Sequence, residues 1–149
     1  MKISEIMAGD SVVVGLKANN KRQLLQDLSV KAAEITGINE RTVFDTLLER
    51  ENLGSTGFGS GTALPHARIP ELKKVYGIFA KLNTPIDFES IDGKPVDLVF
   101  VLLSPEGSGA DHLTALAQVS RILKDESTCK KLRQIDSAED IYALLNNQD

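Results

Sequence analysis

Residues 54 to 66 read Gly54-Ser55-Thr56-Gly57-Phe58-Gly59-Ser60-Gly61-Thr62-Ala63-Leu64-Pro65-His66, a loop with four glycines that ends at a Pro-His pair. Glycine lets the backbone turn through positive φ and approach a ligand closely. Pro65 fixes its own φ and stiffens the chain just before the imidazole. One of the two histidines of the chain is therefore expected on a rigid tip beside backbone amides. That arrangement suits an imidazole that receives or holds an anion such as phosphate.

The composition indicates a single globular domain spanning residues 1–149. The chain is 42% hydrophobic and 26% charged, which is the balance of a folded protein rather than a disordered one. A net charge of −4 argues against non-specific binding to nucleic acid, since phosphate backbones attract basic surfaces. No apolar run approaches the roughly 20 residues of a membrane span. The N-terminus lacks a signal-peptide pattern, so we expect a cytoplasmic location without membrane insertion. Cys129 is the single cysteine, which excludes an intramolecular disulfide.

Apolar patterning predicts an α/β fold. Strands are expected at residues 11–16, 62–64, 76–82 and 96–103, with a weak edge strand at 86–91 after a turn at 83–85. Helices are expected from an Asn cap at 19 or 20 to about residue 36, from Asn39 to about residue 51, at 111–124, at 127–134, and from a Ser137 cap through 145. The helix at 111–124 is expected to turn inward Leu113, Leu116, Ala117, Ser120 and Leu123. Strands and helices do not strictly alternate, so we predict a mixed sheet with helices on both faces.

Four polar residues are expected to join His66 in one site. His112 begins a predicted helix just after the most apolar strand, and ligand sites in α/β folds gather beyond strand ends and at helix N-termini. Arg50 closes the helix before the glycine loop, where a guanidinium can fork onto phosphate oxygens. Ser55 and Thr56, with their amides, can cover the remaining oxygens. Two neutral imidazoles and a guanidinium are suited to phosphoryl transfer, which needs positioning and charge stabilisation more than covalent help.

Each of these residues also has a purely structural interpretation. His66 fits a turn histidine bonded to local backbone, and His112 fits a surface histidine at a helix start. Arg50 fits a solvated partner of a neighbouring glutamate, and the two hydroxyls fit ordinary turn chemistry. A dinucleotide fingerprint is excluded, because the glycines follow a helix rather than a strand. A metal site formed by His66, His112 and Asp111 stays open as a minor alternative, although the histidines lack the close spacing of a typical metal-ligand pair.

These motifs carry a family resemblance. The run from Arg50 to His66 resembles the phosphorylation site of the IIA proteins of the bacterial phosphoenolpyruvate-dependent phosphotransferase system, in the fructose/mannitol class. The segments 84–88 and 91–98, the His112-Leu113 helix and residues 129–133 resemble the same class, most of all its stand-alone nitrogen-regulatory branch. The resemblance covers nearly the whole chain. Residues 62 and 67–68 depart from the usual pattern, although Arg68 keeps a positive charge near the site.

The resemblance implies a fold, a reaction and partners. It implies the fructose/mannitol-type IIA fold, with His66 as phosphoryl acceptor on Nε2 and its Nδ1 held as a donor by a nearby acceptor. His112 and Arg50 match the supporting histidine and arginine of the family. The donor would be a histidine phosphocarrier protein, and no metal or organic cofactor is expected. Leu53 and Phe58, partly buried around the site, are expected to form an apolar contact rim for partners.

Three functions remain open at this stage. The first is a regulatory phosphocarrier of the nitrogen/potassium type, whose phosphorylation state changes which target proteins it binds. The second is a sugar-transport IIA protein that passes phosphate to a IIB domain for fructose or mannitol uptake. The third is an interaction module with a vestigial site, which predicts no phosphorylation at all.

Overall fold

The structure, a computed structural model, describes residues 2–107 and 109–147, apart from the side chain of Phe58. The helices, in chain order, are α1 (Ile3–Ile6), the 3-10 turn η1 (Gly9–Ser11), α2 (Lys21–Thr36), α3 (Glu40–Leu53), α4 (Gly109–Lys124), α5 (Glu126–Gln134) and α6 (Ala138–Asn146). The strands are β1 (Val12–Leu16), β2 (Gly57–Gly59), β3 (Thr62–Ala63), β4 (His66–Arg68), β5 (Tyr76–Ile86) and β6 (Val96–Ser104).

The strands form one mixed sheet in the order β1-β5-β6-β3-β2, with β4 also paired to β6. β5 and β6 are antiparallel, whereas β1 runs parallel to β5, and both β3 and β4 run parallel to β6. β6 is the central strand and is buried on both faces along almost its whole length, as its apolar sequence predicts. The pairing of β4 with β6 sets His66 opposite Leu102 and Arg68 opposite Ser104.

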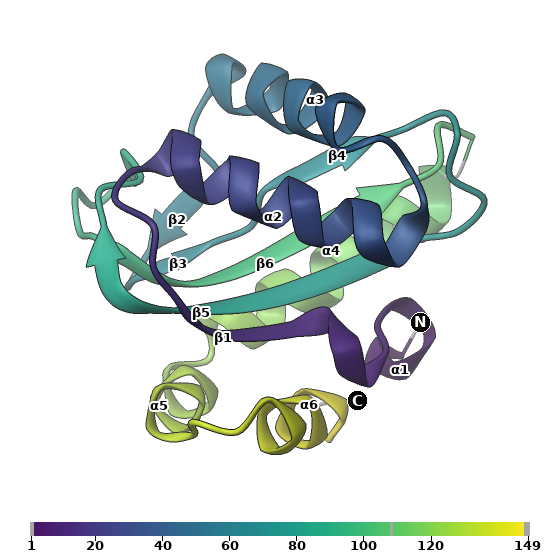
Figure 1. The fold of residues 1–149 in the computed structure, drawn as a ribbon. Helices are drawn as coiled ribbons and strands as arrows, with labels where there is room; N and C mark the ends of the chain where they lie inside the picture. Colours follow the sequence, from purple (N-terminus) through teal and green to yellow (C-terminus); the bar gives the residue numbers. More distant parts are fainter. Residues whose placement is uncertain (1, 108, 148–149) are drawn as a thin grey trace.

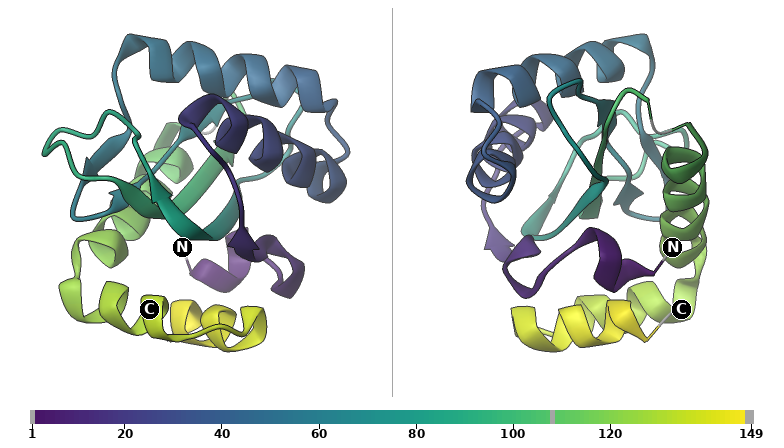
Figure 2. Two further views of the ribbon diagram at one scale, coloured as in Figure 1. Left: turned by 60° about the vertical axis from the view of Figure 1, so that its left-hand side comes forward. Right: turned by 90° about the vertical axis from the view of Figure 1, so that its right-hand side faces the viewer.

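Helices cover both faces of this sheet, which confirms the predicted architecture. In Figure 1, α2 and α3 lie above the sheet, α4 runs behind it, and α5 and α6 lie below. Figure 2 shows the same division from two further directions. One core lies under α2 and α3 and includes Leu24, Leu25, Leu28, Val43, Phe44 and Leu47. The other lies under α1, α4, α5 and α6 and includes Ile3, Ile6, Val119, Ile122, Leu132 and Ile141.

The predicted caps begin and end the helices. The Asn20 side chain accepts a hydrogen bond from the Gln23 amide (2.8 Å), and the Asn39 side chain accepts one from the Arg41 amide (2.8 Å). Gly37 ends α2 in the left-handed conformation, at φ 78°. Each cap satisfies backbone groups that the helix itself leaves unpaired.

The prediction for residues 83–91 is wrong. β5 continues through the expected turn at 83–85 to Ile86, which pairs with Val96. The register of the β5–β6 pair shifts between Lys81 and Ile86, and such an irregularity tolerates a proline that cannot donate to the ladder. Residues 87–91 then form a loop instead of an edge strand.

The predicted inward face of α4 is also partly wrong. The helix buries His112, Ala115, Val119, Ile122 and Leu123, whereas Leu113 is 63% exposed. Because His112 turns inward toward the end of β6, the helix is rotated relative to the orientation that buries the most leucines. The buried face of the first turn therefore contains His112 and not Leu113.

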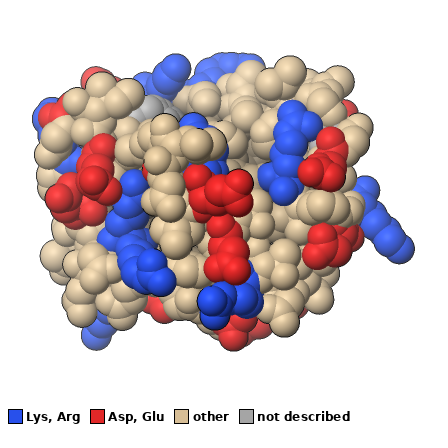
Figure 3. Space-filling view, turned by 90° about the horizontal axis from the view of Figure 1, so that it is seen from above, with Lys and Arg blue, Asp and Glu red and all other residues tan. Residues whose placement is uncertain are grey.

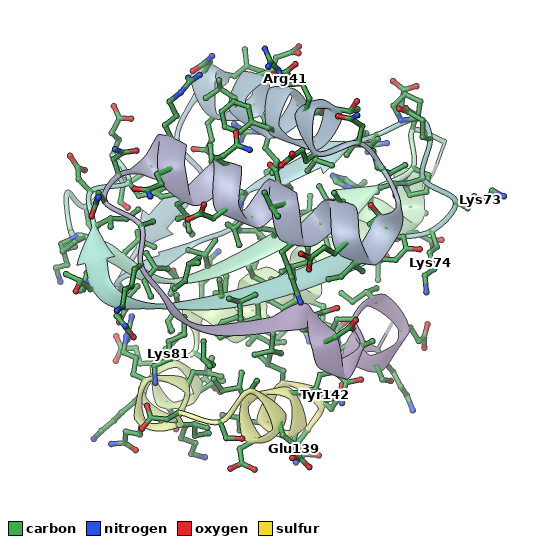
Figure 4. The ribbon with its side chains drawn as sticks, viewed as in Figure 1. Arg41, Lys73, Lys74, Lys81, Glu139 and Tyr142 are labelled. Atoms are coloured by element: carbon green, nitrogen blue, oxygen red, sulfur yellow. The ribbon has the colours of Figure 1, made fainter. Side chains whose placement is uncertain are left out.

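Two side chains fix the C-terminal helices to the rest of the molecule (Figure 4). Lys81 on β5 donates from Nζ to the carbonyls of Arg133 (2.8 Å) and Ile135 (2.7 Å) at the end of α5. Tyr142 on α6 donates from its hydroxyl to the Met7 carbonyl (3.1 Å). Within residues 2–107 and 109–147, none of the helices combines the length and the apolar character that crossing a membrane requires.

Candidate active site

His66 is the first residue of β4, not the tip of a loop as predicted. Its ring Nδ1 lies 2.9 Å from the Leu64 carbonyl oxygen. A carbonyl can only accept a hydrogen bond, so Nδ1 carries the proton in the neutral ring. Nε2 is then left with a free lone pair, which is the nucleophilic form of an imidazole. This contact confirms that an acceptor holds Nδ1 as a donor.

His112 lies in the first turn of α4 and meets His66. The two ring centroids are 6.0 Å apart, with an angle of 52° between the ring planes. His112 is buried, and its Nδ1 lies 2.6 Å from the hydroxyl of Ser104 at the end of β6. The predicted encounter of the two histidines is therefore confirmed, and the surface interpretation of His112 is wrong.

Burial keeps both imidazoles neutral near pH 7. Removal from water is the largest effect on His66 and lowers its pKa. The hydrogen bond to the Leu64 carbonyl raises the pKa, but not enough to cancel the effect of burial. The positive charge of Arg50 lowers the pKa further, and the negative charge of Glu51 raises it by a smaller amount. Burial likewise lowers the pKa of His112, to about 4, with smaller contributions from Arg68 and His66. A neutral imidazole, unlike a protonated ring, has a nitrogen lone pair and is therefore the nucleophilic form.

An open hollow of about 480 Å³ brings together three of the predicted site residues, Arg50, His66 and His112. Two guanidinium groups line it, one from the last turn of α3 and one from β4: those of Arg50 and Arg68. Arg50 donates from Nη1 to the Gly54 carbonyl (2.8 Å), and Arg68 donates from Nη1 to the Glu106 carbonyl (3.3 Å). Lys21, and not Arg50, forms the 2.8 Å ion pair with Glu51. The complete lining is Thr46, Glu49, Arg50, Leu53, His66, Ala67, Arg68, Glu106 and His112.

The hydroxyls of Ser55 and Thr56 are engaged inside the glycine loop. Ser55 donates to the Phe88 carbonyl (2.8 Å) and accepts from the Gly57 amide (3.1 Å). Thr56 donates its hydroxyl to the carboxylate of Glu51, which also accepts the Thr56 amide (3.1 Å). Neither residue lines the hollow. In this structure both hydroxyls shape the segment that leads from α3 into β2.

The predicted apolar rim is only partly described. Leu53 lines the hollow but is 82% exposed, so the expectation that it is partly buried is wrong. The side chain of Phe58 lies outside the described part of the structure. On the face seen in Figure 3, which carries α2 and α3, acidic and basic side chains are interspersed. In the described part of the chain, no cluster of three or more His, Cys, Asp or Glu residues is arranged to hold a metal ion.

Comparison with known proteins decides the family. The profile of the family described as "Phosphoenolpyruvate-dependent sugar phosphotransferase system, EIIA 2" matches residues 5–148. The chain belongs to this family. The resemblance noted in the sequence is thereby confirmed.

Similar EIIA 2 proteins carry a regulatory name. The "Nitrogen regulatory protein" of Bradyrhizobium diazoefficiens is 54% identical over 145 residues, covering 97% of this chain and 95% of that protein. The crystal structure of nitrogen regulatory protein IIA-Ntr from Neisseria meningitidis has a TM-score of 0.91 at 34% identity, covering 96% of this chain and 98% of that one. Mannitol IIA from Escherichia coli has a TM-score of 0.77 at 20% identity, covering 93% and 97%, and that likeness concerns the fold alone. These matches confirm the expected fold and the nitrogen-regulatory branch.

Two contacts of this EIIA 2 site were not predicted from the sequence. Ser104 ends a buried apolar strand, and its only signal is a hydroxyl at the last position of that strand. Glu51 lies next to the predicted Arg50, but the sequence does not indicate that its carboxylate turns inward to hold the Thr56 amide and hydroxyl. Neither residue lines the hollow. Ser104 contacts His112, which does line it, and Glu51 contacts Thr56 in the glycine loop.

Proposed function

We propose that this chain is a phosphocarrier that accepts a phosphoryl group on Nε2 of His66 from a histidine phosphocarrier protein. The observation that carries this proposal is the bond from Nδ1 of His66 to the Leu64 carbonyl. That bond leaves Nε2 unprotonated in a hollow lined by two arginines and a second histidine. Membership of a phosphotransferase-system family supports the same reaction.

The transfer forms one bond and breaks another. Nε2 of His66 attacks the phosphorus of the donor phosphohistidine, and the phosphorus–nitrogen bond of the donor breaks as its imidazole leaves. Nδ1 of His66 keeps its proton throughout and donates it in the hydrogen bond to the Leu64 carbonyl. The phosphoryl oxygens carry negative charge, which Arg50, Arg68 and an N–H of His112 offset in the hollow. No proton has to leave the site.

The loop and the rim have supporting roles in this proposal. Ser55 and Thr56 favour phosphate binding indirectly, by holding the backbone of the glycine loop in shape. Leu53, exposed at the edge of the hollow, and Phe58 in β2 offer an apolar contact to a docking protein. A phosphate adds about −1.5 to −2 charge beside this rim, so that phosphorylation changes which partner fits.

The proposed output is regulation linked to nitrogen. It is supported by the identity, over almost the full length, with a protein named for nitrogen regulation. The alternative output is transfer of the phosphoryl group to a sugar-specific IIB domain, which uses the same chemistry at His66. The two outputs differ in the protein that receives or senses the phosphate.

The first experiment measures the intact mass of the protein after incubation with phosphoenolpyruvate, enzyme I and the phosphocarrier protein. We expect a gain of one acid-labile phosphate in the native chain and none in His66→Ala. The absence of a gain in the native chain would contradict the phosphocarrier function and favour an interaction module. Adding a purified IIB domain to the phosphorylated protein then tests the transport alternative, because rapid loss of phosphate to IIB supports it.

A further inference from the structure

Ser104 occupies a rigid and fully buried position directly behind His112. It is the last residue of β6, where it pairs with Arg68 in the ladder that also sets Leu102 opposite His66. Its carbonyl accepts the Ile69 amide at 2.8 Å, so the backbone of Ser104 is fixed on the β4 side. Its hydroxyl faces α4 and lies 2.6 Å from Nδ1 of His112. The same short stretch of ladder therefore fixes both His66 and the partner of His112.

The number of available partners decides which of the two groups donates. A serine hydroxyl has one proton to donate and can also accept, whereas a neutral imidazole has one N–H and one lone pair. Within the described part of the chain, Nδ1 of His112 is the hydrogen-bond partner of the Ser104 hydroxyl. If Nδ1–H donated to this hydroxyl, the serine proton would be buried without an acceptor, which is unfavourable. If the hydroxyl donates to Nδ1, both groups are satisfied.

We propose that Ser104 is a positioning residue that donates its hydroxyl proton to Nδ1 of His112 and thereby holds His112 as the Nε2–H tautomer. Resting on the phosphocarrier function proposed above, this bond directs one N–H of His112 into the hollow toward the phosphoryl group on His66. The low pKa of His112, about 4, means that the ring is neutral near pH 7, so that its tautomer matters.

The two histidines are then set in opposite tautomers by the atoms behind them. The Leu64 carbonyl can only accept, and so it fixes a proton on Nδ1 of His66 and a lone pair on Nε2. The Ser104 hydroxyl donates, and so it fixes a lone pair on Nδ1 of His112 and a proton on Nε2. The ring centroids are 6.0 Å apart and both histidines line the same hollow, so the proposed tautomers supply that hollow with a nucleophilic nitrogen from His66 and a donor nitrogen from His112. The reverse tautomer of His112 would aim a lone pair at an anionic phosphate.

The test begins with the native protein and needs no variant. Long-range ¹H–¹⁵N spectra of ¹⁵N-histidine-labelled protein at pH 7 assign the tautomer of each ring. We expect His112 to carry its proton on Nε2 and His66 to carry its proton on Nδ1. After phosphorylation of His66, we expect the Nε2–H resonance of His112 to shift while Nδ1 stays unprotonated. A proton on Nδ1 of His112 in the unmodified protein would overturn the proposal.

Variants then measure the effect on transfer. Ser104→Ala is expected to slow phosphoryl acceptance by roughly tenfold, the size expected for one hydrogen bond, and to leave His112 as a mixture of tautomers. Ser104→Thr restores the hydroxyl and is expected to recover both the rate and the tautomer, since β-branched residues fit a strand. Ser29→Ala is the matched control, because Ser29 is equally buried but donates to the Leu25 carbonyl within α2.

The outcomes separate this proposal from the phosphocarrier function. If the native protein takes up no phosphate, the proposed phosphocarrier function is wrong. The tautomer of His112 in the native spectrum still decides whether the Ser104 hydroxyl or Nδ1 of His112 is the donor. If the native protein is phosphorylated and Ser104→Ala transfers at the native rate, the positioning role is wrong. Should the Ser104 variants fail to fold, an unshifted His112 Nε2–H resonance in the phosphorylated native protein would contradict the role by itself.

Discussion

His66 and His112 both have a pKa below the ordinary histidine value, mainly because burial disfavours the charged ring. The pKa of His112, about 4, lies well below the 6.5 of an exposed histidine. Between these two pH values the unfolded chain binds a proton at this position and the native chain does not. The free energy of unfolding therefore falls as the pH drops through this window.

We predict that His112→Asn removes this part of the pH dependence. In the native protein, the contribution of His112 is expected to reduce the free energy of unfolding by at most about 3 kcal/mol as the pH drops from 6.5 to 4. This limit follows from about 1.4 kcal/mol for each unit by which the pKa is lowered. Urea unfolding at several pH values measures the slope in both proteins. The carboxylates contribute equally to each, so the difference isolates the histidine. Parallel slopes across this window would contradict the prediction.

Arg50 is predicted to speed phosphoryl acceptance through the planar set of N–H donors on its guanidinium and not only through its charge. Its Nη1 is bound to the Gly54 carbonyl, which orients the remaining N–H groups in the hollow beside His66. Lysine keeps the charge but lacks the planar fork, so Arg50→Lys is expected to slow phosphoryl acceptance at least tenfold, and Arg50→Ala about a hundredfold. Time-resolved mass spectrometry measures the rate.

Arg41→Lys is the matched control for Arg50→Lys. Arg41 lies on the same helix, α3, but its guanidinium forms an exposed ion pair with Asp45, one turn away. Exposed pairs of this kind contribute little, so its rate is expected to equal that of the native protein. Equal rates for Arg50→Lys and the native protein would show that charge alone suffices.

The residues that line the hollow were more predictable than those behind them. The chain has only two histidines, His66 and His112, and Arg50 ends a helix just before the glycine loop, so the sequence indicates all three. Ser104 is a common residue at the end of an apolar strand. Its contact depends on how α4 packs on β6, which involves the rotation of a helix that the leucine pattern predicted incorrectly.

Among the elements, the glycine loop requires a glycine at position 61 for both backbone conformation and space. Gly61 has φ 80°, and a Cβ there would lie 2.5 Å from Nη2 of Arg133 and 3.0 Å from Oδ1 of Asp97. Its carbonyl also accepts the amides of Asp97 and Leu98 at the start of β6 (3.1 Å each). A side chain at Gly61 therefore strains the backbone and pushes on the bidentate Arg133–Asp97 pair.

We predict that Gly61→Ala lowers the free energy of unfolding by at least about 1–2 kcal/mol, the strain of an alanine at positive φ, with the collision adding to it. Denaturant unfolding measures the loss. Gly9→Ala is the control, because a Cβ at Gly9 meets no atom within 4 Å and its φ is not positive. Equal losses at both glycines would mean that the contacts of Gly61 do not matter.

The longer elements were predicted because local signals agree with packing. The Asn caps, the terminal Gly37 and the apolar run of β6 each indicate the same element that the structure contains. The short strands β2 and β4 were not predicted, because Gly-Phe-Gly and His-Ala-Arg carry no strand pattern of their own. β2 exists through antiparallel pairing with the adjacent strand β3, across a two-residue turn. β4 exists through pairing with β6, and pairing between segments so far apart in the chain is invisible in a local pattern.

At the scale of the whole molecule, the site lies where the two helical layers meet the edge of the sheet. Arg50 comes from α3 in one layer, His112 comes from α4 in the other, and His66 comes from β4 between them. Each layer buries its own apolar core, so that these three side chains project from well-packed elements. The same arrangement leaves one exposed leucine on each helix: Leu53 on α3 and Leu113 on α4.

These two leucines are predicted to contact the phosphocarrier protein. Leu53 lines the hollow and Leu113 follows His112, and both are more than half exposed, at 82% and 63%. Apolar side chains around the centre of an interface lose water on docking, whereas a carboxylate there stays solvated and repels a phosphorylated donor. Leu53→Asp and Leu113→Asp are each expected to raise the KM for the donor about tenfold or more, with little change in unfolding free energy.

Ile91→Asp separates docking from a general loss of apolar surface. Ile91 is 85% exposed in the loop between β5 and β6 and does not line the hollow. Its substitution adds the same charge and removes a similar apolar area, so its KM is expected to equal that of the native protein. A comparable rise in KM for all three variants would assign the effect to net charge. A rise only for Leu53→Asp would restrict the docking surface to the α3 side of the hollow, because Leu113 would then lie outside the contact.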